Sequence, residues 1–175
     1  MRVSILNYYT LSYVFKFKYA NLVIIAKFGE INNCSYMEPD LLSYLASNSR
    51  NKLVFYKEIN LEIKNIDLGL LLSQKIYNLN EQINLPFKVA SELDLLMNQS
   101  MYNHKLYGKM IAISNVGILL EPELKLDINK FFDNYSLNTV LFVKWDGEID
   151  SDFAYFVNKN NSIRIKINNL SHIVI

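Results

Sequence analysis

The segment from Lys109 to Glu148 constrains the fold most, because it sets two buried strands and an amphipathic helix in a fixed order. Met110–Ile113 and Thr139–Trp145 are short apolar runs, which is typical of strands covered on both faces. Between them, Leu126–Tyr135 repeats its apolar residues at helical spacing. A strand, a helix and a second strand in this order predict a parallel β–α–β unit.

Strands and helices also alternate before this segment. Asn21–Lys27 has the length and β-branched content of a central parallel strand, and Leu53–Tyr56 predicts the next strand. Pro39 opens a helix that extends to Ala46, since proline suits the first helical turn. The alternation predicts an α/β fold with a three-layer, mostly parallel sheet. We also expect helices at Ser4–Phe15, Ile66–Tyr77 and Val89–Met97, and a loop at Asn98–Gly108.

After Trp145 the pattern changes to short alternating strands. Asp152–Val157 and Ser162–Ile167 flank the turn-forming residues Asn158–Asn161, which predicts a C-terminal β-hairpin added to an edge of the sheet. The chain is expected to form a single domain. Its N-terminal segment would cover residues 1–20, the α/β core residues 21–145 and the hairpin or edge extension residues 146–175.

Composition and charge exclude several classes of protein. With 51% hydrophobic residues and a net charge of +1, the chain is globular and has no overall attraction to nucleic acid or anionic membranes. Lys16 and Lys18 interrupt the apolar N-terminus, so it lacks the apolar region of a secretion signal. No apolar run is long enough to span a membrane. Since Cys34 is the only cysteine, we expect a cytoplasmic protein without an intramolecular disulfide.

The order of elements from Lys109 to Glu148 resembles that of the second half of a P-loop NTPase core. A working phosphate loop needs two glycines, then a lysine and a Ser or Thr, whereas the loop after Asn21–Lys27 has one glycine, Gly29, and places Lys27 before it. Glu30 adds negative charge where phosphate would bind. Ser114 stands where the Mg²⁺-supporting acid is expected, so ATP hydrolysis should be poor. The residues left as candidates for cofactor binding are Lys27, Gly29, Asn32, Asn33 and Ser114.

Two segments, Asn65–Ile76 and Ile113–Ile149, resemble the BrxF family of small P-loop proteins from bacterial phage-exclusion (BREX) systems. The resemblance implies a P-loop-like fold and a place in an antiviral defence complex. The chain departs from the family pattern at Ser114, throughout the glycine loop, and at Tyr135–Thr139, where an arginine is expected. The resemblance therefore implies degenerate Walker A and Walker B motifs. The matching residues are Asn115, Leu119, Pro122, Glu123, Leu124, Lys125, Asp127, Trp145, Gly147 and Glu148.

Other polar residues have simpler interpretations. Glu121, Glu123 and Asp127 form an acidic cluster that is typical of a solvated loop and a helix N-terminus, with cation binding as the alternative. His104 and His172 are single histidines without an acid or nucleophile at motif spacing.

These observations favour a non-catalytic assembly or regulatory subunit that acts through protein contacts and needs no cofactor. An alternative is an ATPase or switch that binds ATP and Mg²⁺ through an atypical loop, and another is a nucleic-acid-binding module in which N-terminal aromatic residues stack on bases. The sequence leaves open whether the chain forms homo-oligomers. Exposed aromatic and loop residues are the expected partner surface, namely Tyr8, Tyr9, Tyr13, Met101, Tyr102 and Tyr107.

Overall fold

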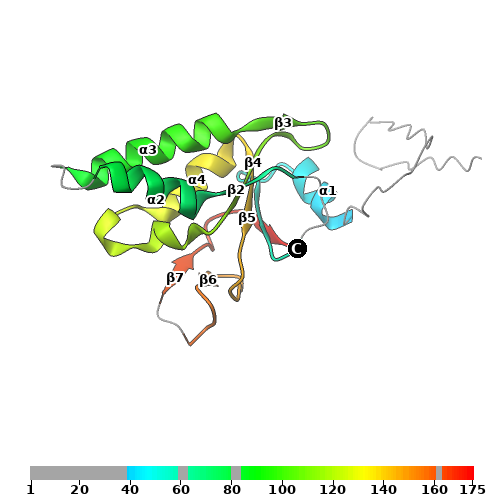
Figure 1. Cartoon of the computed structure of the whole chain (residues 1–175). Helices are drawn as coiled ribbons and strands as arrows, with labels where there is room; N and C mark the ends of the chain where they lie inside the picture. The colour runs from blue at the N-terminus through cyan, green and yellow to red at the C-terminus, as the bar shows by residue number, and fades with distance from the viewer. Residues whose placement is uncertain (1–38, 59–62, 80–83, 161–162) are drawn as a thin grey trace, which may run out of the picture. The chain divides into compact units, whose positions relative to one another are not determined.

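A computed structural model describes residues 39–58, 63–79, 84–160 and 163–175 of the chain (Figure 1). All of these residues belong to one compact unit, Met37–Ile175. The strand predicted at Asn21–Lys27 and the helix predicted at Ser4–Phe15 lie outside the described residues.

The main sheet contains six strands, and all but one of their pairings are parallel. The order across the sheet is β2-β4-β5-β1-β8, and β3 pairs antiparallel with the first residues of β4. The predicted α/β class with a mostly parallel sheet is therefore confirmed. The strands are β1 (Leu53–Tyr56), β2 (Asn65–Asp67), β3 (Tyr102–His104), β4 (Gly108–Ser114), β5 (Val140–Lys144) and β8 (His172–Val174).

Successive strands are not added to the sheet in one direction: the order of addition reverses at β1. From β1 the chain crosses to the far edge at β2 and then returns through β4 and β5 until it lies beside β1 again. The last strand, β8, is added on the other side of β1. As a result, the carboxyl end of β1 lies between those of β5 and β8.

One face of the sheet is covered by helices α2 (Leu68–Asn78), α3 (Leu85–Ser100) and α4 (Ile128–Leu137). Alternate strand residues point to this face and are fully buried, because successive side chains of a strand point to opposite sides. Phe55 is central among them: its ring meets the edges of Phe132 and Trp145 at centroid distances of 5.8 and 6.1 Å. The strand residues on this face are Leu53, Phe55, Ile111, Ile113, Leu141 and Val143.

The opposite face carries a second apolar cluster, which includes residues of helix α1 (Pro39–Ala46). Leu41 of α1 is buried in this cluster, and Tyr44 and Leu45 pack against it. The Tyr44 hydroxyl donates to the carbonyl oxygens of Asn51 and Ser171 at 2.9 and 2.8 Å. Helix α1 is thereby tied to the segments that lead into β1 and β8. The sheet residues of this cluster are Val54, Tyr56, Met110, Ala112, Val140 and Phe142.

Several boundaries differ from the sequence prediction. Ile66, expected in a helix, lies in β2, because Asp67 caps α2 by accepting a hydrogen bond from the Leu70 amide at 2.8 Å. The region Asn98–Gly108, expected as a loop, contains the end of α3 and the strand β3. Two short 3₁₀ helices, η1 (Val116–Leu120) and η2 (Pro122–Leu124), connect β4 to α4.

The C-terminal strands β6 (Phe153–Tyr155) and β7 (Arg164–Lys166) pair antiparallel, as the sequence predicts. They form a separate two-stranded sheet and are not added to the edge of the main sheet. That edge is formed by β8, which has only three residues and therefore too short a pattern to be predicted.

Candidate functional site

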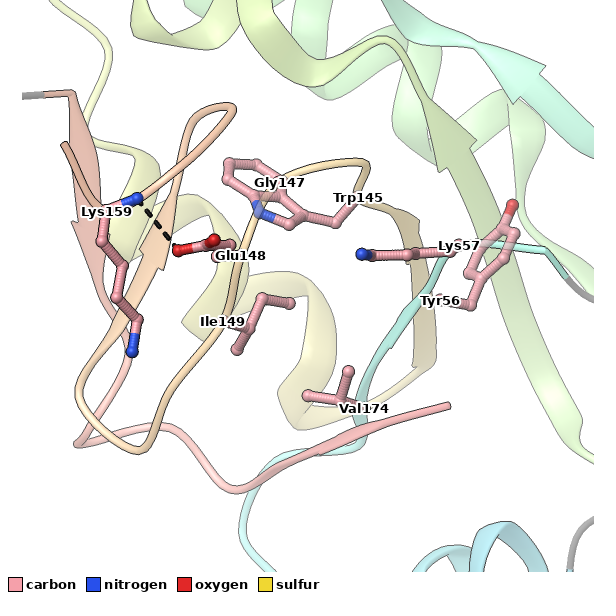
Figure 2. Close-up of a pocket in the computed structure, with 8 residues that line it drawn as sticks. All are labelled: Tyr56, Lys57, Trp145, Gly147, Glu148, Ile149, Lys159 and Val174. Carbon is pink, nitrogen blue, oxygen red and sulfur yellow. Dashed lines mark hydrogen bonds between the residues drawn. The ribbon is translucent and has the colours of Figure 1, made fainter. Parts of the chain in front are cut away.

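A hollow of about 510 Å³ lies at the carboxyl ends of β1, β5 and β8 (Figure 2). In open parallel sheets, ligands bind outside the carboxyl ends of the strands, at the point where the strand order reverses. The hollow, called here the strand-end hollow, is therefore the first place to look for a ligand site. Its lining residues are Tyr56, Lys57, Trp145, Gly147, Glu148, Ile149, Lys159 and Val174.

Trp145 and Gly147 build one wall of this hollow. Trp145 is 3% exposed, and its indole N–H donates to the carbonyl oxygen of Tyr155 at 3.2 Å. A Cβ atom on Gly147 would lie 1.9 Å from the same carbonyl oxygen. The Trp145–Gly147 turn thus lies directly against β6, and the glycine is required by space. The Trp-x-Gly pattern in the sequence has a structural reason here.

Of the charged side chains that line the strand-end hollow, Glu148 and Lys159 have hydrogen-bond or ion-pair partners, whereas Lys57 has none among the described residues. Figure 2 shows the Lys57 side chain extending from the end of β1 into the hollow, where its ammonium group makes no ion pair or hydrogen bond with a described residue. The Glu148 carboxylate accepts the backbone N–H of Lys159 at 3.0 Å. The Lys159 ammonium group lies 3.4 Å from the Asp150 carboxylate. Lys57 is therefore the one lining cation that has no partner among the described residues.

Two further groups at this edge have their pKa shifted. Backbone N–H groups of Asp152 and Phe153 donate to Asp150 and lower its pKa to about 2, so the carboxylate that holds Lys159 stays ionised. Burial raises the pKa of Tyr56, with a smaller contribution from Tyr102. The Tyr56 hydroxyl stays neutral and donates to the Asn65 side-chain oxygen at 3.2 Å.

Sequence reasoning missed Lys57, although a lysine directly after an apolar strand is a usable signal. It was missed because Asn21–Lys27 was predicted to be the strand that precedes the phosphate loop. Among the described strands, it is β1, Leu53–Tyr56, that lies where the strand order reverses. Eight residues, Lys57–Lys64, separate this strand from β2 along the sequence, and none of them is a glycine.

Ser114 lies at the carboxyl end of β4 and does not line the strand-end hollow. Its hydroxyl accepts a hydrogen bond from the Asn65 amide at 2.9 Å and donates to the Ile66 carbonyl oxygen at 3.3 Å. The neighbouring Asn115 donates to the Asp67 carboxylate at 3.2 Å. These bonds join β4 to β2. The other candidates for cofactor binding, Lys27, Gly29, Asn32 and Asn33, lie outside the described residues, as does Cys34.

The acidic cluster and the histidines have structural contacts. Asp127 caps α4 by accepting a hydrogen bond from the Lys130 amide at 3.0 Å, while Glu121 and Glu123 are exposed. His104 stacks on Tyr107 at a centroid distance of 4.6 Å, and His172 meets the Phe55 ring edge-on. Within the described ranges, no three or more His, Cys, Asp or Glu side chains come together in a way that could hold a metal ion.

The predicted partner residues fall into two groups. Tyr8, Tyr9 and Tyr13 lie outside the described residues. In the segment around β3, Met101 and Tyr102 are half-buried and Tyr107 is 7% exposed, whereas Leu106 at the turn is 62% exposed. The Tyr102 hydroxyl accepts the Lys64 backbone N–H at 3.0 Å. A partner role for these residues stays a prediction.

Comparison of the chain with protein-family models, with curated proteins and with solved structures gives no match. Each helix in the described part of the chain falls short of the length and hydropathy that a membrane-spanning helix needs.

Proposed function

We propose that this chain is a non-catalytic assembly or regulatory subunit, built on a degenerate P-loop-like scaffold, which acts through protein contacts in a bacterial anti-phage system. The order of the parallel strands supports the scaffold. Numbered along the described part of the chain, the five parallel strands run 2-3-4-1-5 across the sheet. In open α/β sheets ligands bind where the strand order reverses, which is at β1 here, and the phosphate loop of P-loop proteins follows a strand in this type of sheet.

The proposal that the protein is non-catalytic rests mainly on the sequence of the connection Lys57–Lys64. A phosphate loop surrounds phosphate with the backbone N–H groups of a glycine-rich turn and the N-terminus of the helix that follows. The connection after β1 has no glycine, and it is no longer than the phosphate-loop motif itself before β2 begins at Asn65. It leaves no room for both the motif and a helix.

The bonds of Ser114 support the same conclusion. In an active P-loop enzyme, a carboxylate at the end of the corresponding strand supports the metal ion and its water. Here the hydroxyl of Ser114 is already bonded to Asn65 and Ile66. The end of β4 therefore stabilises the sheet and offers no charge to a metal.

Nucleotide binding and phosphate release test this proposal. We expect that ATP or GTP with Mg²⁺ neither raises the melting temperature of the purified protein nor releases phosphate. A rise in melting temperature that Lys57→Ala or Lys27→Ala abolishes, or steady phosphate release, would overturn the non-catalytic assignment. Lys144→Ala, which removes an exposed lysine at the end of β5, is the matched control.

A second candidate is a nucleotide-binding switch with an atypical cradle, and it is favoured by the Lys57 ammonium group in the strand-end hollow, which has no partner among the described residues. Trp145 is the only tryptophan of the chain and lines this hollow, so its fluorescence reports binding there. A saturable change on titration with AMP or ATP that is lost in Lys57→Ala supports the switch. An unchanged spectrum at millimolar nucleotide favours the non-catalytic subunit.

The proposed role of this chain in a phage-exclusion system is supported by the resemblance of Asn65–Ile76 and Ile113–Ile149 to the BrxF family. The genes that flank this one provide its test. Neighbouring genes for a methyltransferase, a phosphatase-like protein and a large ATPase are expected, and their absence would remove the support for this part of the proposal.

A further inference from the structure

A second hollow of about 670 Å³ shares no lining residue with the strand-end hollow and lies between the first turns of α2, the η1–η2 segment and the residues Phe156 and Ile163 that adjoin β6 and β7. Most of its floor and walls are apolar, while Asp67 and Glu121 contribute carboxylates to its lining. We call it the acid-rimmed groove. Its apolar lining residues are Leu70, Ile118, Leu120, Pro122, Phe156 and Ile163.

Several of the apolar side chains that line this groove are exposed. Leu70 is 51% exposed, Ile163 46% and Phe156 37%, and the neighbouring Val157 is 62% exposed. Single exposed apolar residues are normal on a protein surface, but a cluster around one concave surface indicates a binding site. The groove gathers residues from three separate parts of the chain, so the clustering results from the fold and not from one apolar stretch.

The walls of the groove are held in place. The Phe156 ring lies so close to Gly117 that a Cβ atom there would be 3.1 Å from it, and the ring also meets Trp145 edge-on at 6.3 Å. Val157 has a φ of 77°, and the Asn158 amide bonds to the Phe156 carbonyl oxygen at 3.2 Å across it. This is a tight γ-turn, which is costly for a β-branched residue. Such strain persists only where the surrounding structure fixes it.

The charged side chains that line the groove are both acidic, which favours a ligand with positive charge. The Asp67 carboxylate is partly used, since one of its oxygens accepts the Leu70 amide and the Asn115 side chain. Glu121 makes no side-chain hydrogen bond with a described residue, and no lysine, arginine or histidine is among the lining residues. An apolar floor with only acidic charge at its rim repels phosphate-bearing ligands and complements a segment that joins apolar to basic side chains.

We propose that the acid-rimmed groove binds a short segment of a partner protein in which apolar side chains stand next to lysine or arginine. The apolar side chains contact Leu70, Phe156 and Ile163, while the basic groups lie near Glu121 and Asp67. The inference rests on the proposed function, because it names the surface through which protein contacts are made and the chemistry of the partner.

Selection of a displayed library of short random peptides on the full-length protein tests the groove. The expected result is enrichment of peptides that combine apolar and basic residues, whose affinity is then measured by fluorescence anisotropy. Leu70→Glu should weaken their binding about tenfold or more, a loss of about 1.4 kcal/mol, because it places a charge at the centre of the apolar contact, where the few dominant residues of an interface lie. Glu121→Lys should weaken the same peptides and make the remaining binding less sensitive to salt.

Leu95→Glu is the matched control, because Leu95 is 50% exposed on α3 and does not line the groove. It should leave peptide binding unchanged, and the melting temperatures of all three variants show whether they fold. Enriched peptides without the apolar and basic pattern, or equal affinities for Leu70→Glu and Leu95→Glu, would overturn the groove assignment. Nucleotide hydrolysis by the wild-type protein would instead contradict the non-catalytic function, so the two failures are distinguishable.

Discussion

Gly147 joins the end of β5 to the C-terminal segment at a position where no side chain fits. The Cβ of an alanine would lie 1.9 Å from the Tyr155 carbonyl oxygen and 2.9 Å from the Trp145 indole nitrogen. Because the nearest atom belongs to the backbone, relief requires the turn to move away from β6. We expect Gly147→Ala to lower the free energy of unfolding by more than about 2 kcal/mol, measured by urea denaturation followed by circular dichroism.

Gly108→Ala provides the comparison for this variant. Gly108 has a φ of 70°, but a Cβ atom there would meet nothing within 4 Å. Its substitution therefore costs only the left-handed backbone conformation, about 1 kcal/mol. If both variants lose the same stability, the close approach at Gly147 is not what makes glycine necessary.

Asp150 gives the stability of the protein a defined dependence on pH. Hydrogen bonds from the Asp152 and Phe153 amides lower its pKa in the folded protein to about 2, below its ordinary value of 3.8. The folded state therefore binds this proton less readily than the unfolded state. The resulting stabilisation is fully present above pH 3.8 and is lost as the pH falls towards about 2.

We predict that Asp150→Asn has a lower melting temperature than the wild type at neutral pH, and that this difference shrinks as the pH falls to about 2. Thermal unfolding followed by circular dichroism across this range measures it. Asp152→Asn is a suitable control, because this exposed side chain makes no hydrogen bond with a described residue. A difference that stays constant with pH would show that the Asp150 carboxylate does not act through its charge.

At the scale of elements, α2 begins where it does because Asp67 accepts the Leu70 amide. Such an N-cap satisfies a backbone donor that otherwise has no partner, and its loss costs about 1 kcal/mol. We expect Asp67→Ala to destabilise the protein by this amount in chemical denaturation. Asp67→Asn keeps an oxygen acceptor at the same position and should lose less than half as much. Equal losses would mean that the charge, not the cap, stabilises the start of α2.

The elements that the sequence predicts well are those with local causes. Pro39 and Asp127 mark the starts of α1 and α4, and the apolar runs of β1, β4 and β5 are long enough to show their type. The short strands β2, β3 and β8 have three residues each and form because longer neighbours pair with them. Their sequences alone contain too few residues to establish a period.

The candidate site was predicted less well than the fold because its position depends on the order of strands in space. The sequence shows that Lys57 follows a strand, but not that this strand lies between β5 and β8. The acid-rimmed groove likewise combines Leu70, Glu121 and Ile163, which no local pattern connects. The cap at Asp67 was not predicted either: the helix was expected to begin at Ile66, one residue before it, although the bonded Leu70 amide lies within one helical turn.

At the scale of the whole molecule, the reversal of strand order places the most protected backbone at the centre of the sheet. β1 is paired on both sides, by β5 and β8, and β5 by β1 and β4, whereas β8 pairs only with β1 among the described strands. Residues Leu53, Val54 and Phe55 of β1 are fully buried, while Val174 of β8 is 50% exposed. Amides of the central strands should therefore exchange only through large openings, and those of β8 through local ones.

We predict that hydrogen exchange followed by mass spectrometry finds the slowest amides in β1, β4 and β5 and faster exchange in β8. Leu53→Ala should accelerate exchange in all three central strands together, because it creates a cavity shared by the core on the helix-covered face. Val174→Ala, at the exposed edge, should affect β8 and leave the central strands unchanged. If β8 exchanges as slowly as β1, the edge strand opens only with the whole sheet, and the strand-end hollow would then have a rigid boundary on all three of its strands.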